Sequence, residues 1–289
     1  MDLRPLRERS GKGFARGLSL CRGHSQEVCP PVGILVAAGA SAVGEYEIFG
    51  QLCRESETSC GRRGGGIHLH LEMHERYEEW LDYLFDHEVT ASAWHWAADA
   101  PVFEASELDY AVLIGETFRR AGRDLLRFSD AQLNQGLLLL ASAACSDYMA
   151  AIKDARIPMA TRLATIRSVY DLYRDCFQLR CTETLSHCNR TGRSALNEIC
   201  YMFWDISVLG CLEENDEERP LVDCVFSVLG DTLKIPHLAC QEAAIHGYGE
   251  ISLFHPRRVE EALDAFLAGG ISSGPLRAYA ENARSGNIL

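Results

Sequence analysis

The amino-acid sequence predicts an all-α fold, an irregular α-α superhelix of stacked helical hairpins. From Met73 onward, apolar side chains recur at the helical period. Prolines and capping-box patterns mark repeated helix starts, and no segment after Met73 alternates with the period of two that predicts a strand. Because the links between these helices are short, consecutive helices should be antiparallel and should pair as hairpins.

Composition divides the chain at about residue 72. Residues 1–72 contain 12 of the 24 glycines and show no sustained helical period. Such a segment buries too little apolar surface to offset the entropy lost on ordering it. We therefore expect a poorly ordered N-terminal extension over 1–72 and an all-helical domain over 73–289. A sharper hypothesis is that Met73 is the true start, which native peptides mapping before Met73 would exclude.

The first predicted helices belong to the part of the chain between residues 73 and 153. The helix over 73–87 has one apolar face, formed by Tyr77, Trp80, Leu81 and Leu84. Capping-box patterns at 106–109 and 129–132 start the next two helices. We expect the helix after the second capping box to be long, because its apolar stripe continues to Ala151.

Prolines organise the later helices, since proline is favoured in the first turn of a helix. We expect helices to open at Pro158, Pro220, Pro236 and Pro256, with a further helix over 195–211. Two glycines at 269–270 should end the helix that Pro256 opens. A short last helix is predicted over 275–283.

Residues 235–269 combine a proline-opened helix rich in small residues, a tight turn at 254–256 and an amphipathic second helix. This pattern resembles a HEAT-type repeat, which implies a HEAT-like α-solenoid that binds proteins through an extended face. Glycine in a helix costs about 1 kcal/mol relative to alanine, so Gly247 and Gly249 predict close approach of a second helix. The rest of the chain shows no obvious self-similarity, which favours an irregular stack over a regular array.

The charge and cysteine content exclude several classes of protein. The formal net charge is −13, and residues 73–289 hold 33 Asp and Glu against 19 Lys and Arg. An acidic domain repels phosphate, so we expect no nucleic-acid partner. The sequence contains no run of 18 apolar residues, so we expect no membrane-spanning helix. The 12 cysteines are scattered without a Cys-x-x-Cys pair, which is typical of reduced thiols in the cytoplasm.

Two aromatic segments contain the candidate binding residues. Trp94, His95 and Trp96 could frame a partner's side chain, or they could cap one end of the helical stack. The second segment, 197–205, could present a binding surface, or it could be a buried helix whose aspartate pairs with an arginine. The candidate residues of this segment are Asn197, Glu198, Tyr201, Trp204 and Asp205.

Histidines and cysteines are the candidate catalytic and metal-binding groups of the sequence. His246 and His255 could each act as a general base, although no nucleophile has a readable relation to them. Two clusters have potential metal ligands: one is His68, His70, Glu72 and His74, and the other is Cys176, Cys181, His187 and Cys188. The histidine cluster has no strict spacing motif. Cys176 and Cys181 have the outer spacing of a zinc knuckle, but five residues apart on a helix they do not share a face, so we expect no metal and no cofactor.

These observations favour a cytoplasmic protein–protein interaction module with an acidic, HEAT-like scaffold and a partner that the charge suggests is basic. One alternative is an immunity- or inhibitor-type protein that binds a basic target. Another is an all-α enzyme with an acidic or histidine-containing pocket, and a third is a structural domain of an assembly. A pocket gathering Asp205, Glu198 or His246 would favour the enzyme, and a long groove lined by acidic residues would favour the binder.

Overall fold

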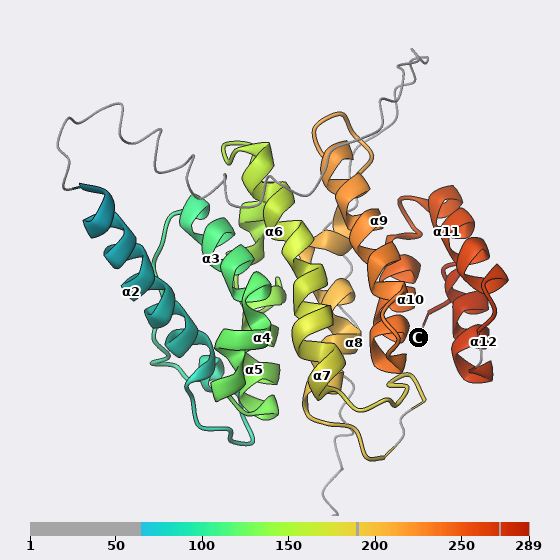
Figure 1. Ribbon diagram of the computed structural model, residues 1–289, viewed down its shortest axis with the longest axis horizontal. Coiled ribbons are helices and arrows are strands. Elements are labelled where there is room, and N and C mark those ends of the chain that lie inside the picture. The colour runs from blue at the N-terminus through green and yellow to red at the C-terminus, as the bar shows by residue number, and fades with distance from the viewer. Residues whose placement is uncertain (1–64, 189–190, 272, 289) are drawn as a thin grey trace, which may run out of the picture. The chain divides into compact units, whose positions relative to one another are not determined.

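The computed structural model describes residues 65–289, apart from 189–190, 272 and 289, and the side chains from residue 74 onward (Figure 1). The chain divides into two units, residues 1–71 and 72–289. The extension predicted over 1–72 lies almost entirely outside the described residues. Over the described ranges the protein is all-helical and has no strand, which confirms the predicted fold class.

The described α-helices follow one another from residue 65 to residue 283. The helices of the first half are α2 Gly65–Phe85, α3 Glu107–Arg119, α4 Ala121–Asp124, α5 Asp130–Ala141, α6 Met159–Leu172 and α7 Gln178–Arg180. The helices of the second half are α8 Leu196–Ile206, α9 Arg219–Leu233, α10 Leu238–Ile251, α11 Pro256–Ala268 and α12 Gly274–Ala283. A π-helical turn, Tyr173–Phe177, joins α6 to α7. Short 3-10 turns cover Trp94–Trp96, Leu125–Arg127, Tyr148–Lys153 and Val208–Cys211.

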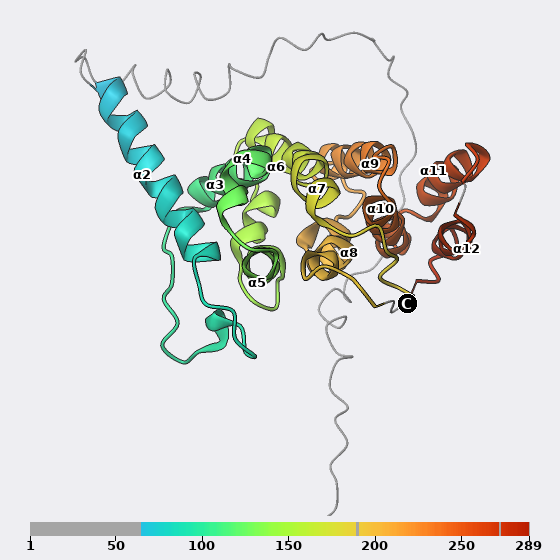
Figure 2. The same ribbon diagram turned by 60° about the horizontal axis from the view of Figure 1, so that its bottom comes forward.

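Within residues 72–289 most of these helices lie in two rows (Figure 2). In one row α6 packs between α3 and α9, and in the other α8 packs against both α5 and α10. Helix α10 also contacts α9, α11 and α12, and α11 packs on α12. Consecutive helices therefore do pair at the C-terminal end, and α10 lies at the centre of their contacts.

Most of the local signals for helix starts and stops are confirmed. Ser106 accepts a hydrogen bond from the backbone N–H of Asp109, and Ser129 accepts one from Gln132, so both capping boxes are formed. Proline occupies the first turn of α9, α11 and α12. Helix α11 ends at Ala268, and Gly270 has a φ of +82°, a backbone conformation that favours glycine.

Several predicted helix boundaries are wrong. Helix α10 begins at Leu238, two residues after Pro236, and Pro158 is the N-cap of α6 rather than a residue of its first turn. Helix α2 begins at Gly65 rather than at Met73, since adding turns to an existing helix costs little once its packed part has formed. Helix α5 ends at Ala141, where Ser142 is extended, and the apolar stripe predicted to reach Ala151 is buried instead by a separate 3-10 turn. The helix predicted over 195–211 ends at Ile206 for the same reason, because the next residue is extended.

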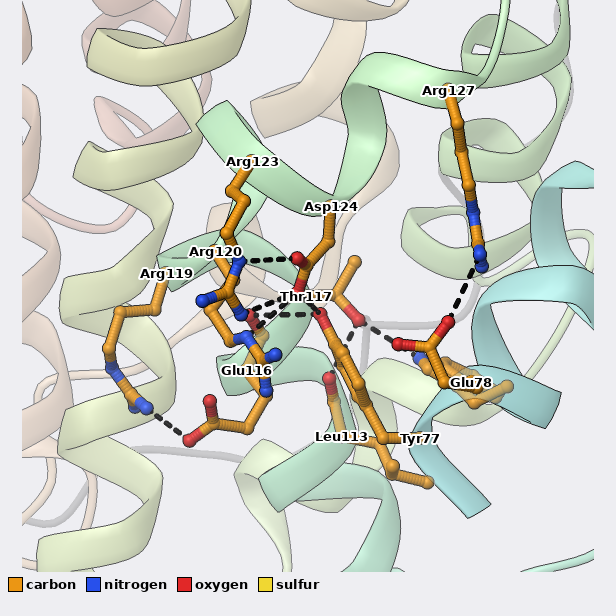
Figure 3. Close-up of polar contacts among 11 residues, drawn as sticks. Tyr77, Glu78, Leu113, Glu116, Thr117, Arg119, Arg120, Arg123, Asp124 and Arg127 are labelled. Carbon is orange, nitrogen blue, oxygen red and sulfur yellow. Dashed lines mark hydrogen bonds and ion pairs between the residues drawn. The ribbon is translucent and has the colours of Figure 1, made fainter. Parts of the chain in front are cut away.

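Polar contacts attach α2 to α3 and α4 (Figure 3). The Tyr77 hydroxyl donates to Asp124 Oδ2 at 3.1 Å, and Arg120 Nε forms an ion pair with the same carboxylate at 2.7 Å. The buried Trp80 donates from Nε1 to Thr117 Oγ1 at 3.1 Å. Arg127 lies 3.1 Å from a carboxylate oxygen of Glu78. These contacts hold the acidic helix α2 in one position on the body.

Close helix approach at the α10 glycines is confirmed. A Cβ atom on Gly247 would lie 2.7 Å from Trp204 Cγ in α8, and one on Gly249 would lie 2.5 Å from a side-chain atom of Ile288. Almost every residue of α10 is buried. Among the described residues, no helix is both long enough and apolar enough to cross a bilayer.

Candidate functional site

Three of the predicted site residues meet where α8, α10 and α12 pack together. Tyr201 and Asp205 are one helical turn apart on α8, and His246 faces them from α10. The rings of Tyr201 and His246 are 4.2 Å apart. Helix α12 adds Tyr279, whose hydroxyl lies 2.8 Å from the Tyr201 hydroxyl and 2.7 Å from His246 Nδ1. The two tyrosines therefore hold the imidazole of His246 in one orientation.

Two carboxylates face the other ring nitrogen of this histidine. His246 Nε2 is 3.6 Å from Glu250 Oε1, and ligand atoms of Asp205, His246 and Glu250 all lie within 4.8 Å of one another. Residues four apart lie on the same helix face, which places Glu250 beside His246 on α10. No lysine or arginine of the described residues forms an ion pair with Asp205 or Glu250. The sequence interpretation in which Asp205 pairs with an arginine is therefore wrong.

Burial controls the ionisation of these three groups. It raises the pKa of Asp205, and burial followed by the charge of Asp205 raises the pKa of Glu250 to about 7. Burial and then the charge of His187 lower the pKa of His246 to about 4. The histidine is therefore neutral near pH 7, and it lies beside two carboxylates that repel each other when both are ionised.

A second polar group adjoins this cluster through Tyr279. The ring of His187 stacks on Tyr279 at 4.1 Å, and its Nδ1 lies 2.6 Å from Oε1 of the fully buried Glu242 on α10. The backbone N–H groups of Ser186 and His187 donate to the same carboxylate at 2.7 and 2.9 Å. Cys188 Sγ is 3.2 Å from His187 Nε2. Glu242 thus fixes both the loop and the imidazole that the exposed thiol contacts.

The other predicted residues of the 197–205 segment have different surroundings. Asn197 is buried and braces a loop, accepting hydrogen bonds from the backbone N–H groups of Thr182 and Ser194 and donating to the Thr182 carbonyl. Trp204 is fully buried and its ring is parallel to that of Tyr173, so it is unavailable to a binding surface. Glu198 is exposed on the first turn of α8, away from the cluster.

The Trp94–Trp96 turn lies in the loop between α2 and α3. Trp94 is half-buried, stacking on His87 at 3.7 Å and packing edge-on against Tyr83 at 5.3 Å. His95 is also half-buried, and burial lowers its pKa. Trp96 is 60% exposed. One tryptophan therefore anchors the turn and the other is presented to solvent.

The remaining candidates do not assemble into a site. His255 is buried and its Nε2 lies 2.9 Å from the Leu212 carbonyl oxygen, a structural contact at the start of α11. Cys176 and Cys181 are buried, whereas Cys188 is exposed. Among the described residues, these cysteines form no group of potential metal ligands. Of the N-terminal histidine cluster, the side chain of His74 is exposed, and those of His68, His70 and Glu72 lie outside the described residues.

A pocket between α11 and α12 contains none of the predicted residues. Its lining comes from Ser252, Pro256, Arg257, Glu260, Glu281, Arg284 and Ser285. The missed residues Glu242 and Glu250 had a usable sequence signal, because they lie four positions before and after His246 in a helix that is otherwise small and apolar. His187 was a sequence candidate only as a metal ligand beside the cysteines, and Tyr279 had no signal, since both are distant in sequence from α10.

Comparisons with known proteins add no relative to this description. No family model, no curated protein and no solved structure matches the chain significantly.

Proposed function

We propose that this chain is a protein-binding module that recognises a basic segment of another protein through residues 75–109. This stretch, called here the acidic segment, comprises most of α2, the loop after it and the start of α3. The observation that carries the proposal is the exposed Trp96 within a stretch of 35 residues that has a net charge of −9.

The charge of the acidic segment is concentrated and is only partly compensated. Residues 75–109 contain ten Asp and Glu and a single arginine, a net charge of −9. Arg127 neutralises part of this charge by pairing with Glu78 at 3.1 Å and Asp82 at 2.9 Å. Glu88 and Asp99 are exposed and, among the described residues, form no ion pair. A local negative field of this kind attracts cationic partners and accelerates their association.

Exposed apolar side chains lie within the same segment. Val89, Trp96 and Val102 are 47%, 60% and 76% exposed. Six large apolar residues are exposed in the described part of the chain, and these three of them lie in the α2–α3 loop. Exposed tryptophans are frequent anchors of protein interfaces, because a large rigid ring buries much area at little entropic cost.

The loop that presents these residues is held at both ends. Before Trp96, the ring of Trp94 stacks on that of His87 with 3.7 Å between the ring centres, and this contact fixes the turn. After it, Phe103 is buried edge-on against Trp80 at 5.0 Å, and the Phe103 carbonyl accepts a hydrogen bond from the Tyr110 hydroxyl at 2.7 Å. A pre-ordered loop loses less entropy on binding than a mobile one.

The chemistry of the segment favours arginine-rich partners. A guanidinium can pair with a carboxylate through two hydrogen bonds and can also stack on an exposed indole. An inhibitor of a basic target would use the same surface. The enzyme alternative is weaker, because Asp205 and His246 meet in the structure but the pocket between α11 and α12 is lined by neither of them.

Selection from a random peptide library displayed on phage tests the proposal with the full-length chain. We expect enrichment of peptides with net positive charge and at least one apolar residue. Trp96→Ala should lower the affinity for the best peptide at least tenfold, which corresponds to about 1.4 kcal/mol of binding free energy. The double variant Glu88→Gln/Asp99→Asn should also lower the affinity for this peptide. Its loss of affinity should be larger at low salt than at high salt, because salt screens the attraction that the variant removes.

Two matched controls keep the test specific. Leu253→Ala removes an apolar side chain that is 77% exposed between α10 and α11. Asp216→Asn/Glu261→Gln removes two exposed charges outside the acidic segment. Both should bind the selected peptide as the wild type does. Enriched peptides without positive charge, or equal losses for Trp96→Ala and Leu253→Ala, would disprove the proposal.

A further inference from the structure

The cluster formed by Asp205, His246 and Glu250, called here the α8–α10 triad, has the composition of a metal site. Two carboxylates and one imidazole offer three ligand atoms within 4.8 Å of one another. The ligands come from two packed helices, and His246 and Glu250 lie one turn apart on α10. Ligands on rigid helices are held more precisely than ligands on loops.

The orientation of His246 makes one ring nitrogen available to a ligand. Its side chain is about 95% buried, and Nδ1 is engaged by the Tyr279 hydroxyl at 2.7 Å. The other nitrogen, Nε2, is buried and has no hydrogen-bond partner among the described residues. When Nδ1–H donates to Tyr279, the Nε2 lone pair points toward the two carboxylates. Buried polar atoms without partners are uncommon in folded proteins, and this one faces a set of ligands.

The tyrosines supply the support that a metal-binding histidine needs. Histidine ligands usually donate their second N–H to an acceptor that fixes the ring and its tautomer. Here Tyr279 has that position, and its hydroxyl is in turn 2.8 Å from that of Tyr201. The imidazole is therefore positioned by a hydrogen-bonded chain that begins outside the triad.

The charge of the triad also calls for a cation. Asp205 and Glu250 lie close together in a partly buried position, and no lysine or arginine among the described residues forms an ion pair with either. A divalent ion bound to both carboxylates would balance their charge at a place where the described residues supply no lysine or arginine.

We propose that Asp205, His246 and Glu250 bind one divalent transition-metal cation of the zinc class. A mixed nitrogen and oxygen ligand set favours zinc over magnesium or calcium, which prefer oxygen ligands alone. Three protein ligands leave a tetrahedral ion with one open position, and both carboxylates are accessible enough for water to reach it. This site lies on helices other than the acidic segment, so the inference is independent of the proposed function.

To test the inference, the full-length protein is stripped of metal with a chelator and then titrated with Zn²⁺. Its zinc content and its melting temperature are measured. Wild type should retain one Zn²⁺ per chain more than Asp205→Asn or Glu250→Gln. Loss of a ligand should lower the affinity for Zn²⁺ by more than the roughly 10- to 100-fold typical of losing a group that only orients a ligand. Glu250→Gln should not lower the melting temperature of the metal-free protein, because it relieves repulsion between carboxylates. Its Zn²⁺-induced rise in melting temperature should be lost.

Controls separate this site from the cysteines of the chain, which also bind Zn²⁺. Glu261→Gln, at an exposed carboxylate of α11, should behave as wild type. With Co²⁺ as a spectroscopic probe, the difference between wild type and Glu250→Gln should lack the thiolate-to-metal charge-transfer band. Tyr279→Phe should keep the stoichiometry and weaken binding about tenfold. Equal zinc content and equal stabilisation in wild type, Asp205→Asn and Glu250→Gln would overturn the inference, as would a thiolate band in the difference spectrum.

Discussion

Gly247 of α10 lies directly against the indole of Trp204 in α8, so that a Cβ at this position would be 2.7 Å from Trp204 Cγ. Leu229 of α9 approaches the same point, at 2.8 Å. This contact sets the spacing between the central helix and two of its neighbours. The absence of a side chain at Gly247 is therefore a packing requirement.

Gly247→Ala should destabilise the protein, although alanine favours helix by about 1 kcal/mol. Overpacking a rigid core costs about 1–3 kcal/mol, and both neighbours at this site are fully buried. Gly230→Ala in α9 is the matched control, because its Cβ would meet only the Tyr248 hydroxyl at 3.5 Å. Urea unfolding should show a loss of stability for the first variant and a small gain for the second. A gain for both would show that α10 can shift away from α8.

Glu242→Gln should destabilise the loop that carries His187 and Cys188. Both oxygens of Glu242 accept backbone hydrogen bonds, from Ser186 and His187, so an amide would direct an N–H₂ group at a donor. Loss of a buried hydrogen bond to a charged group costs about 1.5–3 kcal/mol. Hydrogen exchange of the Ser186 and His187 amides should accelerate, whereas Glu183→Gln, at an exposed carboxylate, should leave it unchanged. Unchanged exchange in Glu242→Gln would contradict this role.

The two tryptophans of the α2–α3 loop should differ in their effect on stability. Trp94→Ala removes the stack on His87 and the contact with Tyr83, and should cost about 1–3 kcal/mol. Trp96→Ala removes a side chain that is 60% exposed and should change stability by less than about 0.5 kcal/mol. Chemical denaturation of both variants measures the difference. Equal destabilisation would show that Trp96 supports the fold, and would weaken its assignment to partner binding.

Asp124 should contribute stability that is lost in acid. Burial by itself raises the pKa of this carboxyl, but hydrogen bonding to Arg123 and the charges of Arg120 and Arg123 outweigh burial and lower the pKa (Figure 3). A group with a lower pKa in the folded state stabilises the protein above its unfolded pKa of about 3.9. That contribution disappears as the pH falls through the folded value.

Measurement of unfolding free energy between about pH 2 and pH 7 tests the contribution of Asp124. Asp124→Asn should be less stable than wild type at pH 7, and the difference should shrink below about pH 4. Asp216→Asn, at a fully exposed carboxylate, removes the same charge without this effect. A constant difference between wild type and Asp124→Asn across the range would rule out the linkage.

The sequence by itself determined the helical class and the local helix boundaries that depend on neighbouring residues. Ser106 and Ser129 cap their helices because the residues three positions later complete the box. Gly247 was recognisable as a point of close approach because glycine inside a helix carries a free-energy cost that packing must offset. These signals are readable because each depends on residues within about one turn of one another.

Only the tertiary structure decided where helices stop and which polar groups meet. The apolar residues beyond Ala141 are buried as predicted but belong to a separate turn, because periodicity reports burial and not the continuity of a helix. His246 was a sequence candidate, yet its partner Tyr279 is 33 residues away and its neighbour Tyr201 is on another helix. Trp204 and Trp96 are the same residue type, and only packing buries one and exposes the other. Contacts between distant residues follow from how the helices pack, which local side-chain preferences leave open.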